Sequence, residues 1–526
     1  MRKLICLIII LSGATAFAAS DTSGSSAGMN TYDVSAEYRH DILDVEEEET
    51  DFYRCKGSVS GSQNTGAFAA AAWMPDEKRK TYTFSFLASD PSIPFSITGG
   101  DYNVQFGSGL LIGHGRPYNP DPFQKEVSVC EESGIRPVTS GSQSSSFRGF
   151  SLAHSISDSL STTVFCSRAL RYYSGGDSSS SIGTLLSRPD KEGKNTEPVY
   201  LRCAGGMITF TRDLFITSIS GFHADLISPS GKRILWAVSD EGGGYRSSSG
   251  GSLYSAYNDG VLRAYIDFAL SSSGYIRDGK NTRINDKAFQ SEADIHKESF
   301  DLRLAAKSIG KEYYSPFFAP IGSKSPSNSF FWEATISPLE SFSLSSDAAI
   351  EKKKTVTNFD PEPSSTCREG VSIAVKPFSP LILSVGHRLT GRALESFPER
   401  QQFRGGIKFD FSGYDQTEIG YIEQRKSGAV SRVFQCQAGI GIARVVTIGL
   451  TYAEIRAKTD DNVYLSPLPL DGVMVPWIAV NGRARLASMR VAADWKGLSL
   501  HAKGLCLWTG RTAVHRRLEF AIRGSW

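Results

Sequence analysis

Apolar and polar residues alternate along most of the chain from about residue 51 onward. In "VLRAYIDFAL" (261–270), the apolar Leu262, Ile266 and Phe268 fall on one side, and the charged Arg263 and Asp267 fall on the other. A repeat of two residues is that of a β-strand, whose successive side chains point to opposite faces. The same alternation recurs in 299–307, 402–411 and 498–508. No segment keeps a helical repeat, so the pattern predicts an all-β chain.

The length of these runs separates two kinds of all-β protein. Each run covers about ten residues, which is what a tilted strand needs to cross a bilayer, whereas strands of soluble sandwiches are nearer five or six. In the second half, short connections at 376–380, 411–415, 441–444 and 494–497 tend to take turns with longer ones at 390–401 and 457–477. We therefore predict an antiparallel transmembrane β-barrel of roughly 16–24 strands. Its longest external loops are expected at 114–146, 173–197 and 272–298.

The first 50 residues differ from the rest. Arg2 and Lys3 precede the apolar run 4–11, and "AFA" (16–18) offers a small-residue cleavage site, as in a secretory signal peptide. A membrane anchor is the alternative reading of this segment. Residues 19–50 are polar and acidic, which indicates a periplasmic leader with little structure. The predicted organisation is a signal peptide at 1–18, a leader at 19–50 and a barrel at 51–526.

The last strand-like run, "RRLEFAIRGSW", also alternates. Leu518, Phe520, Ile522 and Trp526 share one face of it. This ending resembles the C-terminal signature of bacterial outer-membrane barrels, which has a terminal aromatic residue and apolar residues at every second position before it; Gly524 departs from the pattern. The resemblance implies a location in outer-membrane lipid and recognition of this strand by the barrel-assembly machinery.

The face opposite to the apolar one would line the barrel lumen. Its charged positions carry both signs, which favours water and solutes of mixed charge over one kind of ion. Mutual pairing of these charges within the lumen is the alternative. The candidate lumen-lining residues are Arg263, Asp267, Asp301, Arg303, Lys408, Asp410, Lys503, Arg517, Glu519 and Arg523.

A glycine-rich stretch, "GDYNVQFGSGLLIG" (100–113), interrupts the regular alternation. Glycines within a strand allow bulges, bends and close backbone approach. The stretch is similar to the "GDY…FGQGL" run of a group of large bacterial outer-membrane barrels, and Ser108 departs from that run. The matching residues that we single out as a bend or plug segment are Gly100, Asp101, Tyr102, Phe106, Gly107 and Gly109. Any barrel with a glycine-rich strand and bend would give the same pattern. The following loop, 114–146, is the best candidate for filling the lumen.

Charge and motif content exclude several classes of function. The net charge of +2 falls to near zero once Arg2 and Lys3 are removed, so a nucleic-acid partner is not expected. The cysteines are widely spaced and match no metal template, and neither a metal nor another cofactor is expected. Their disulfide pairing stays open. "GFHADLIS" offers His223, Asp225 and Ser228 as a possible hydrolase triad, which such short runs contain by chance.

These observations favour a barrel that passes an unidentified solute, and we do not expect an enzyme. A barrel that only displays loops at the surface, in a structural or adhesive role, is the alternative. An outer-membrane hydrolase is the second alternative. Whether the lumen is open or plugged is left open by the sequence.

Overall fold

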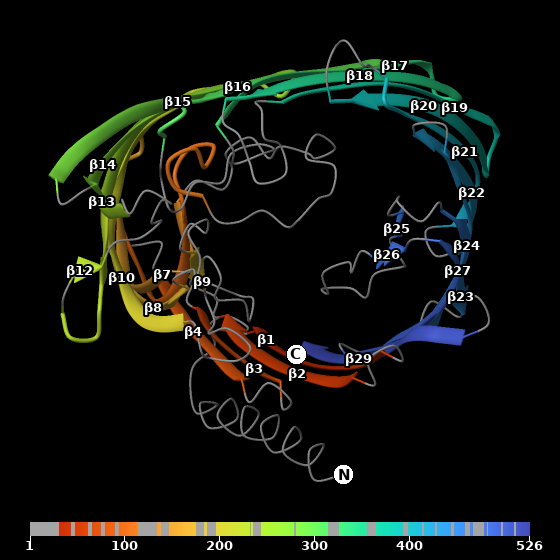
Figure 1. Cartoon of the computed structure of the whole chain (residues 1–526), viewed down its shortest axis with the longest axis horizontal. Coiled ribbons are helices and arrows are strands. Elements are labelled where there is room, and N and C mark those ends of the chain that lie inside the picture. The colour runs from red at the N-terminus through yellow and green to blue at the C-terminus, as the bar shows by residue number, and fades with distance from the viewer. Residues whose placement is uncertain are drawn as a thin grey trace, which may run out of the picture.

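The structure is a computed structural model of the chain, and the described part consists of β-strands and their connections (Figure 1). No described helix is long and apolar enough to cross a membrane. Of β1–β3 and β29 the structure describes the backbone alone. The described residues are 31–43, 48–60, 66–74, 79–89, 94–113, 134–137, 147–174, 184–186, 196–231, 233–234, 244–277, 280–313, 326–354, 364–392, 398–412, 415–426, 429–442, 446–457, 463–465, 478–480, 482–495, 498–509 and 512–525.

Long strands follow one another with antiparallel pairing. Those of the first half are β1 (Thr31–Leu43), β2 (Glu48–Ser60), β3 (Gly66–Met74), β4 (Arg79–Ser89), β5 (Phe95–Gln105), β7 (Phe147–Ser157), β8 (Leu160–Ser174), β10 (Thr196–Arg212), β11 (Phe215–Ile227), β13 (Gly244–Asn258), β14 (Leu262–Arg277) and β15 (Lys280–Lys297). Those of the second half are β16 (Phe300–Ile309), β17 (Ser327–Leu339), β18 (Phe342–Lys353), β19 (Ser365–Phe378), β20 (Leu381–Gly391), β21 (Arg400–Ser412), β22 (Asp415–Lys426), β23 (Ala429–Ile442), β24 (Val446–Arg456), β27 (Arg483–Trp495), β28 (Leu498–Thr509) and β29 (Thr512–Ser525).

Five short strands complete the described set. They are β6 (Gly134–Pro137), β9 (Thr184–Leu186), β12 (Arg233–Ile234), β25 (Val463–Leu465) and β26 (Ile478–Val480). β25 and β26 pair only with each other. β6, β9 and β12 pair with β5, β8 and β11 respectively. β6, β9 and β12 extend from wall strands, and none of the five short strands belongs to the closed series of wall strands.

The long strands close into a ring. The described main sheet has 27 strands, and setting aside β6, β9 and β12 leaves 24 in the wall. β29 pairs with β28 on one side and with β1 on the other, from Asp33↔Ser525 to Leu43↔His515. Figure 1 shows the ring, with β29 beside β1 and β2. Closure satisfies every strand edge, which is the condition for placing a sheet in lipid.

Side chains alternate across this wall as the sequence predicts. Ile219 and Val385 point outward and are 65% and 67% exposed, whereas their sequence neighbours on the inward face are smaller or polar. On β14 the outward positions are apolar from Leu262 to Leu270 and become polar at Ser272. A band of this length on tilted strands matches a hydrocarbon core about 25 Å tall. We call it the apolar belt.

The two rims of the ring differ. Turns of two or three residues join the strands at one rim, which we call the turn rim: 158–159, 213–214, 259–261, 298–299, 340–341 and 379–380. In the 259–261 turn, Asp259 accepts the backbone N–H groups of Val261 and Leu262, and these bonds hold the pKa of its carboxyl below the ordinary value. The opposite rim carries the longest connections, among them those between β5 and β7 and between β24 and β27, together with two-residue connections at 278–279, 427–428 and 510–511. We call it the loop rim.

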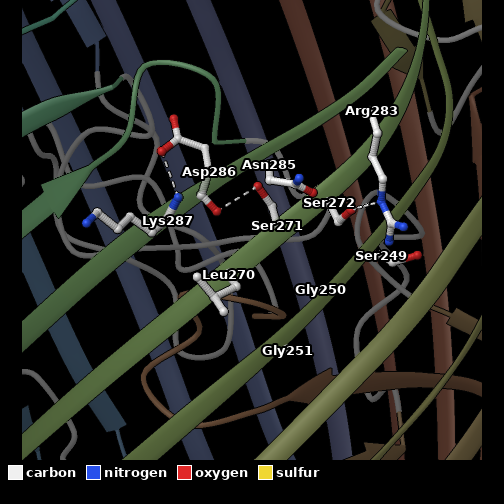
Figure 2. A pocket seen from close by; sticks show the side chains of 10 residues that line it. All are labelled: Ser249, Gly250, Gly251, Leu270, Ser271, Ser272, Arg283, Asn285, Asp286 and Lys287. Atoms are coloured by element: carbon white, nitrogen blue, oxygen red, sulfur yellow. Dashed lines mark hydrogen bonds between the residues drawn. The ribbon is translucent and has the colours of Figure 1, made fainter. Parts of the chain in front are cut away.

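The wall rises beyond the apolar belt at β13–β15. There a hollow of about 580 Å³ opens between strands on the outer side, and Arg283 donates from Nε to the Ser272 hydroxyl at 2.6 Å (Figure 2). Its outward lining is Ser249, Leu270, Ser272, Arg283, Asn285 and Lys287. The polar lining places this part of the wall outside the hydrocarbon.

These features confirm the predicted all-β antiparallel barrel, and the wall count lies at the top of the predicted range. Two boundaries were wrong. The predicted leader, 19–50, contains β1 and the start of β2, because charged residues at alternate positions suit a lumen face as well as a solvated tail. The predicted loop 272–298 is the β14–β15 hairpin, whose strands have polar residues on both faces beyond the belt. The predicted signal peptide lies outside the described residues.

The assignment of faces predicts the effect of a charge on either side of β20. Val385→Arg places a cation in the apolar belt and should lower the free energy of unfolding by about 2–4 kcal/mol near the bilayer midplane. Ser384→Arg is the matched control on the inward face, and it should change that free energy by much less. Urea titrations of the protein folded into lipid vesicles measure both. Equal losses for the two variants would contradict the faces.

Candidate functional site

The chain begins to leave the wall at Gly100. β5 pairs with β4 from Ser96 to Gly100 and with β7 from Phe95 to Tyr102, and it pairs with β6 through Tyr102–Gln105. Gly100 has φ +83°, and a Cβ there would lie 2.2 Å from the carbonyl oxygen of Phe84. Only glycine allows this bend next to the neighbouring strand. The predicted bend residue therefore lies where the chain changes direction.

A tight reversal follows inside the ring. The Phe106 N–H donates to the Ile112 carbonyl at 2.9 Å, and the Gly109 N–H donates to the Phe106 carbonyl at 3.0 Å. Gly107 and Gly109 have φ of +54° and +87°, a region that side chains with a Cβ rarely adopt. Residues 102–113 thus form a compact strand and turn, which we call the inner segment.

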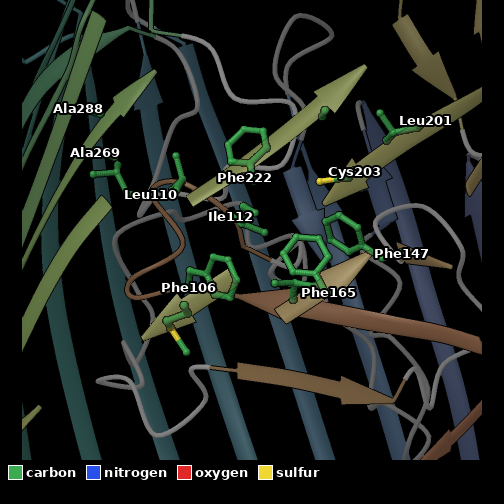
Figure 3. Packing of buried hydrophobic residues seen from close by; sticks show 14 of the residues in the cluster. Phe106, Leu110, Ile112, Phe147, Phe165, Leu201, Cys203, Phe222, Ala269 and Ala288 are labelled. Atoms are coloured by element: carbon green, nitrogen blue, oxygen red, sulfur yellow. The ribbon is translucent and has the colours of Figure 1, made fainter. Parts of the chain in front are cut away.

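The inner segment packs against one side of the inward wall. Phe106, Leu110, Leu111 and Ile112 are completely buried. Their neighbours include Phe165 of β8, Leu201 and Cys203 of β10, Phe222 of β11 and Ala269 of β14 (Figure 3). Burying each such aliphatic or aromatic side chain stabilises the packing by about 1.5–3 kcal/mol. This apolar cluster is the largest core among the described residues.

Glycines on the wall and on the inner segment, which have no side chain, let the two approach closely. A Cβ on Gly250 of β13 would lie 2.5 Å from Leu111 Cδ1. A Cβ on Gly107 would lie 2.9 Å from Asp267 Oδ2 and 3.0 Å from Tyr254 Cβ. These glycines therefore determine how close the backbone of the inner segment lies to the wall.

A buried polar contact fixes the tip of the segment. Ser108 donates to Asp267 Oδ2 from its backbone N–H at 2.9 Å and from its hydroxyl at 2.7 Å. Asp267 is fully buried on the inward face of β14. Near the other side of the turn, the Tyr313 hydroxyl donates to the Leu110 carbonyl at 2.9 Å. Buried hydrogen bonds to a carboxylate are strong and hold one geometry.

Two further predicted bend residues, Tyr102 and Asp101, form hydrogen bonds with strands of the wall. The Tyr102 hydroxyl donates to the Cys166 carbonyl at 2.6 Å and so ties the start of the inner segment to β8. Asp101 points to the outer side, where it accepts from Arg148 at 2.8 Å and from the Phe84 N–H at 3.0 Å. Asp101 thus bonds to β4 and β7, the two wall strands beside the bend, and not to the turn of the inner segment.

Beside the inner segment, the inward face of β15–β20 carries a network of charges. Arg303 pairs with Glu292 at 2.6 Å and approaches Asp294 at 3.7 Å. Asp347 lies 3.0 Å from Arg368 and 3.5 Å from Arg388. Lys307 lies 3.6 Å from Glu351. We call these residues the charge network.

The network is only partly enclosed. The side chains of Asp347 and Arg388 are 17% and 22% exposed, whereas that of Glu292 is fully buried. The guanidinium groups of Arg303 and Arg368 lie over the Phe331 ring, at 5.6 and 5.9 Å from its centre. Pairing and stacking orient these long side chains and leave charge of both signs facing the lumen.

The structure places the predicted lumen residues unevenly. Asp267, Arg303 and Lys503 are inward and largely buried. Lys408 shares the inward parity of its strand and is partly exposed, and Arg263 and Asp301 lie near the turn rim, where Asp301 pairs with His296. β29 places Glu519 opposite Lys503 and Arg523 opposite Ser499. The side chains of Asp410, Arg517, Glu519 and Arg523 are outside the described set.

Sequence reasoning missed Glu292, Asp347, Arg368 and Arg388. Asp347, Arg368 and Arg388 each share a strand with outward apolar residues, such as Ile350, Val371 and Val385, at odd spacings from them, so a strand-by-strand reading would have placed them inward. Glu292 lay within the predicted loop 272–298 and was never assigned a face. Of the predicted assembly residues, Leu518, Phe520 and Ile522 lie in β29, and Trp526 lies outside the described residues.

The possible hydrolase triad does not form. His223 pairs through Nδ1 with the Ser249 hydroxyl at 2.8 Å, Asp225 accepts from Arg202 at 2.6 Å, and the Ser228 hydroxyl bonds to that of Ser230 at 2.8 Å. The three predicted members therefore have separate partners. Within the described residues, no group of three or more His, Cys, Asp or Glu could hold a metal ion.

Comparisons with known proteins give similar folds and no family. No family model matches the chain, and no curated protein matches its sequence. The translocation pore of the P pilus usher PapC is similar at a TM-score of 0.42 and 8% identity, over 94% of this chain and 99% of that one. The siderophore receptor PirA from Pseudomonas aeruginosa is similar at a TM-score of 0.47 and 7% identity, over 95% and 82%. OpdK from Pseudomonas aeruginosa, solved with vanillate, gives a TM-score of 0.36 and 10% identity, over 75% and 99%.

The Ser108–Asp267 contact predicts how firmly the inner segment is held. Asp267→Ala leaves two buried donors of Ser108 without their acceptor, at a cost of about 1–3 kcal/mol, so amide hydrogen exchange over 106–112 should become faster by about tenfold or more. Ser220→Ala is the control, because it removes a buried hydroxyl that pairs with Ser252 on the same wall at 2.7 Å. Mass spectrometry of exchanged peptides measures both. Unchanged protection in Asp267→Ala would mean that apolar packing alone holds the segment.

Proposed function

We propose that the protein is an outer-membrane barrel that passes a polar solute of mixed charge through its lumen, along the charge network. The observation that carries this proposal is the contrast between the two faces of β15–β20. The outward face is apolar at Leu304, Phe330 and Val385, and the inward face holds paired charges that remain partly open to solvent. A charged inner face inside an apolar belt provides an aqueous route across hydrocarbon.

Positive and negative side chains on the same inward face favour a solute that itself carries both kinds of charge. Arg303, Lys307, Arg368 and Arg388 supply cations, and Glu292, Asp347 and Glu351 supply carboxylates, each within reach of an opposite charge. A zwitterionic or doubly charged solute can exchange partners with successive pairs, whereas a simple ion meets attraction and repulsion in turn. The network thus supports passage of small polar molecules with weak selectivity for simple ions.

The inner segment narrows this route. It occupies the lumen beside β8–β14 and is anchored at Asp267, Gly250 and Cys166. A barrel of this size encloses more space than strand side chains can fill, so a returning segment sets the free cross-section. We infer small conductance for the intact protein and larger conductance when the anchor at Asp267 is removed.

Placement in the bacterial outer membrane completes the proposal. An apolar belt, short turns at one rim and long connections at the other are the arrangement of barrels whose turns face the periplasm. In this orientation the loop rim is external, and the assembly machinery reads β29. A barrel that only displays loops would have the same placement but would not conduct ions. Conductance therefore distinguishes the two functions.

Ion selectivity tests the route along the charge network. Arg368→Gln with Arg388→Gln removes two cations beside Asp347, so the permeability ratio of K⁺ to Cl⁻ in planar bilayers should rise several-fold. Arg148→Gln with Arg202→Gln is the control with the same loss of charge on the outer face. Reversal potentials under a KCl gradient measure both. A ratio that moves equally in both variants, or no conductance even after Asp267→Ala, would refute passage through this lumen.

Assembly tests the orientation. On β28, Ala502 shares the outward face with the exposed Leu500, and Lys503 is on the inward face. The register places Phe520 opposite Ala502 and Glu519 opposite Lys503. Phe520→Asp should therefore reduce the amount of folded protein in the outer membrane severalfold. Glu519→Asn, on the other face, should have little effect. Immunoblots of membrane fractions, with and without boiling, measure both; similar levels would argue against recognition of this face.

A further inference from the structure

A group of arginines lies on the outer wall at the edge of the apolar belt. On β22 the outward positions read Ile419, Tyr421, Glu423 and Arg425 in the direction of the loop rim. On β23 and β24 the same order from apolar to aromatic to charged ends at Arg432 and Arg456. On β27 the outward positions are Met489, Ala487, Arg485 and Arg483, without an aromatic residue. We call Arg425, Arg432, Arg456 and Arg485 the outer basic cluster.

Strand pairing brings these side chains together. Arg456 is directly opposite Arg432 on one side and Arg483 on the other, and Arg485 is directly opposite Glu454. Glu423 accepts from Arg425 at 2.8 Å and from Arg432 at 3.1 Å. Glu454 accepts from Arg456 at 2.9 Å. With Arg483 included, five outward arginines lie around two carboxylates, so this part of the outer wall keeps an excess of positive charge.

The arginines are open to the surroundings of the wall. The side chains of Arg425 and Arg432 are each 58% exposed, and that of Arg456 is 66% exposed. Like charges directly opposite on neighbouring strands destabilise a sheet. Glu423 and Glu454 balance only part of the positive charge on this exposed face, so an external anion bound between Arg432 and Arg456 would stabilise the wall.

The depth of the cluster identifies the kind of anion. Tyr421, Phe434 and Tyr452 point outward just below it and are 41–44% exposed. Aromatic side chains collect at the boundary between hydrocarbon and headgroups, so the arginines lie at headgroup level. The apolar residues beneath them, Ile440 and Leu450, face acyl chains. Arginine binds phosphate through two parallel N–H bonds, which suits headgroup phosphates.

We propose that the outer basic cluster binds the phosphate groups of a phosphorylated lipid in the external leaflet, with its acyl chains lying over Phe434, Ile440 and Leu450. Arg432 and Arg456 share one phosphate, and Arg425 and Arg485 flank it. The inference rests on the membrane placement in the proposed function and not on solute passage. A lipid held here would brace β22–β27, next to the connection between β24 and β27.

Binding of lipopolysaccharide tests the proposal. The purified full-length protein in detergent is titrated with lipopolysaccharide, which carries phosphates and acyl chains, and the thermal unfolding midpoint is followed. Arg432→Gln with Arg456→Gln should weaken the stabilisation by at least tenfold in apparent affinity. Arg212→Gln with Lys297→Gln is the control, because it removes two exposed cations at the turn rim. Equal weakening in both variants would overturn the site in favour of general charge attraction.

Two further arms separate the lipid from other sources. Dephosphorylated lipopolysaccharide should stabilise the protein much less, and inorganic phosphate alone should not reproduce the effect; full stabilisation by inorganic phosphate would overturn the lipid assignment. Arg432→Lys with Arg456→Lys keeps the charge without the paired N–H geometry and should give intermediate affinity. Conductance of the glutamine variant should equal that of the unaltered protein, so failure of this site is distinguishable from failure of the proposed function.

Discussion

Backbone hydrogen bonding in a medium without water is the constraint on which this structure depends. Each N–H and C=O that enters hydrocarbon must find a protein partner, and an open sheet always leaves two edges unsatisfied. Pairing of β29 with β1 removes both edges at once. The alternation of faces, the apolar belt and the polar lumen all follow, because a closed sheet has one side in lipid and one side enclosed.

Closure creates a second problem, which the inner segment resolves. A ring this large has an inward face that its own side chains cannot cover. The chain turns inward at Gly100, and the aromatic and aliphatic side chains of the inner segment pack against β8, β10 and β11. Away from the segment, the inward face of β15–β20 carries the charge network, and that of β23–β28 carries a second apolar cluster with Ile455, Leu486 and Leu507. Apolar packing and ion pairing thus divide the inner wall between a scaffold for the segment and a surface suited to water.

The alternation of Ile266, Asp267 and Phe268 was sufficient to assign faces, because lipid on one side imposes a strict contrast. The same reasoning failed over 272–287, where β14 and β15 carry polar residues on both faces beyond the belt. It also missed 288–297, where β15 re-enters the belt but the polar Ser291 stands between the outward Phe289 and Ala293. It also could not pair Ser108 with Asp267, which are 159 residues apart and carry no local signature of contact. Glycines at 100, 107 and 109 suggested a bend without fixing its direction, since glycines in a strand also allow bulges and close backbone approach; the structure has all three at positive φ.

The order of elements along the chain has a consequence for how the molecule is built. The inner segment begins within β5, whereas most of the surfaces that hold it belong to β8–β16 and appear later in the chain. The last pairing in the sequence, between β1 and β29, joins strands at opposite ends of the polypeptide. The inner segment can therefore complete its packing only once β8–β16 are in place, however early in the chain it is made. The seam between β1 and β29 can form only when the last strand is present.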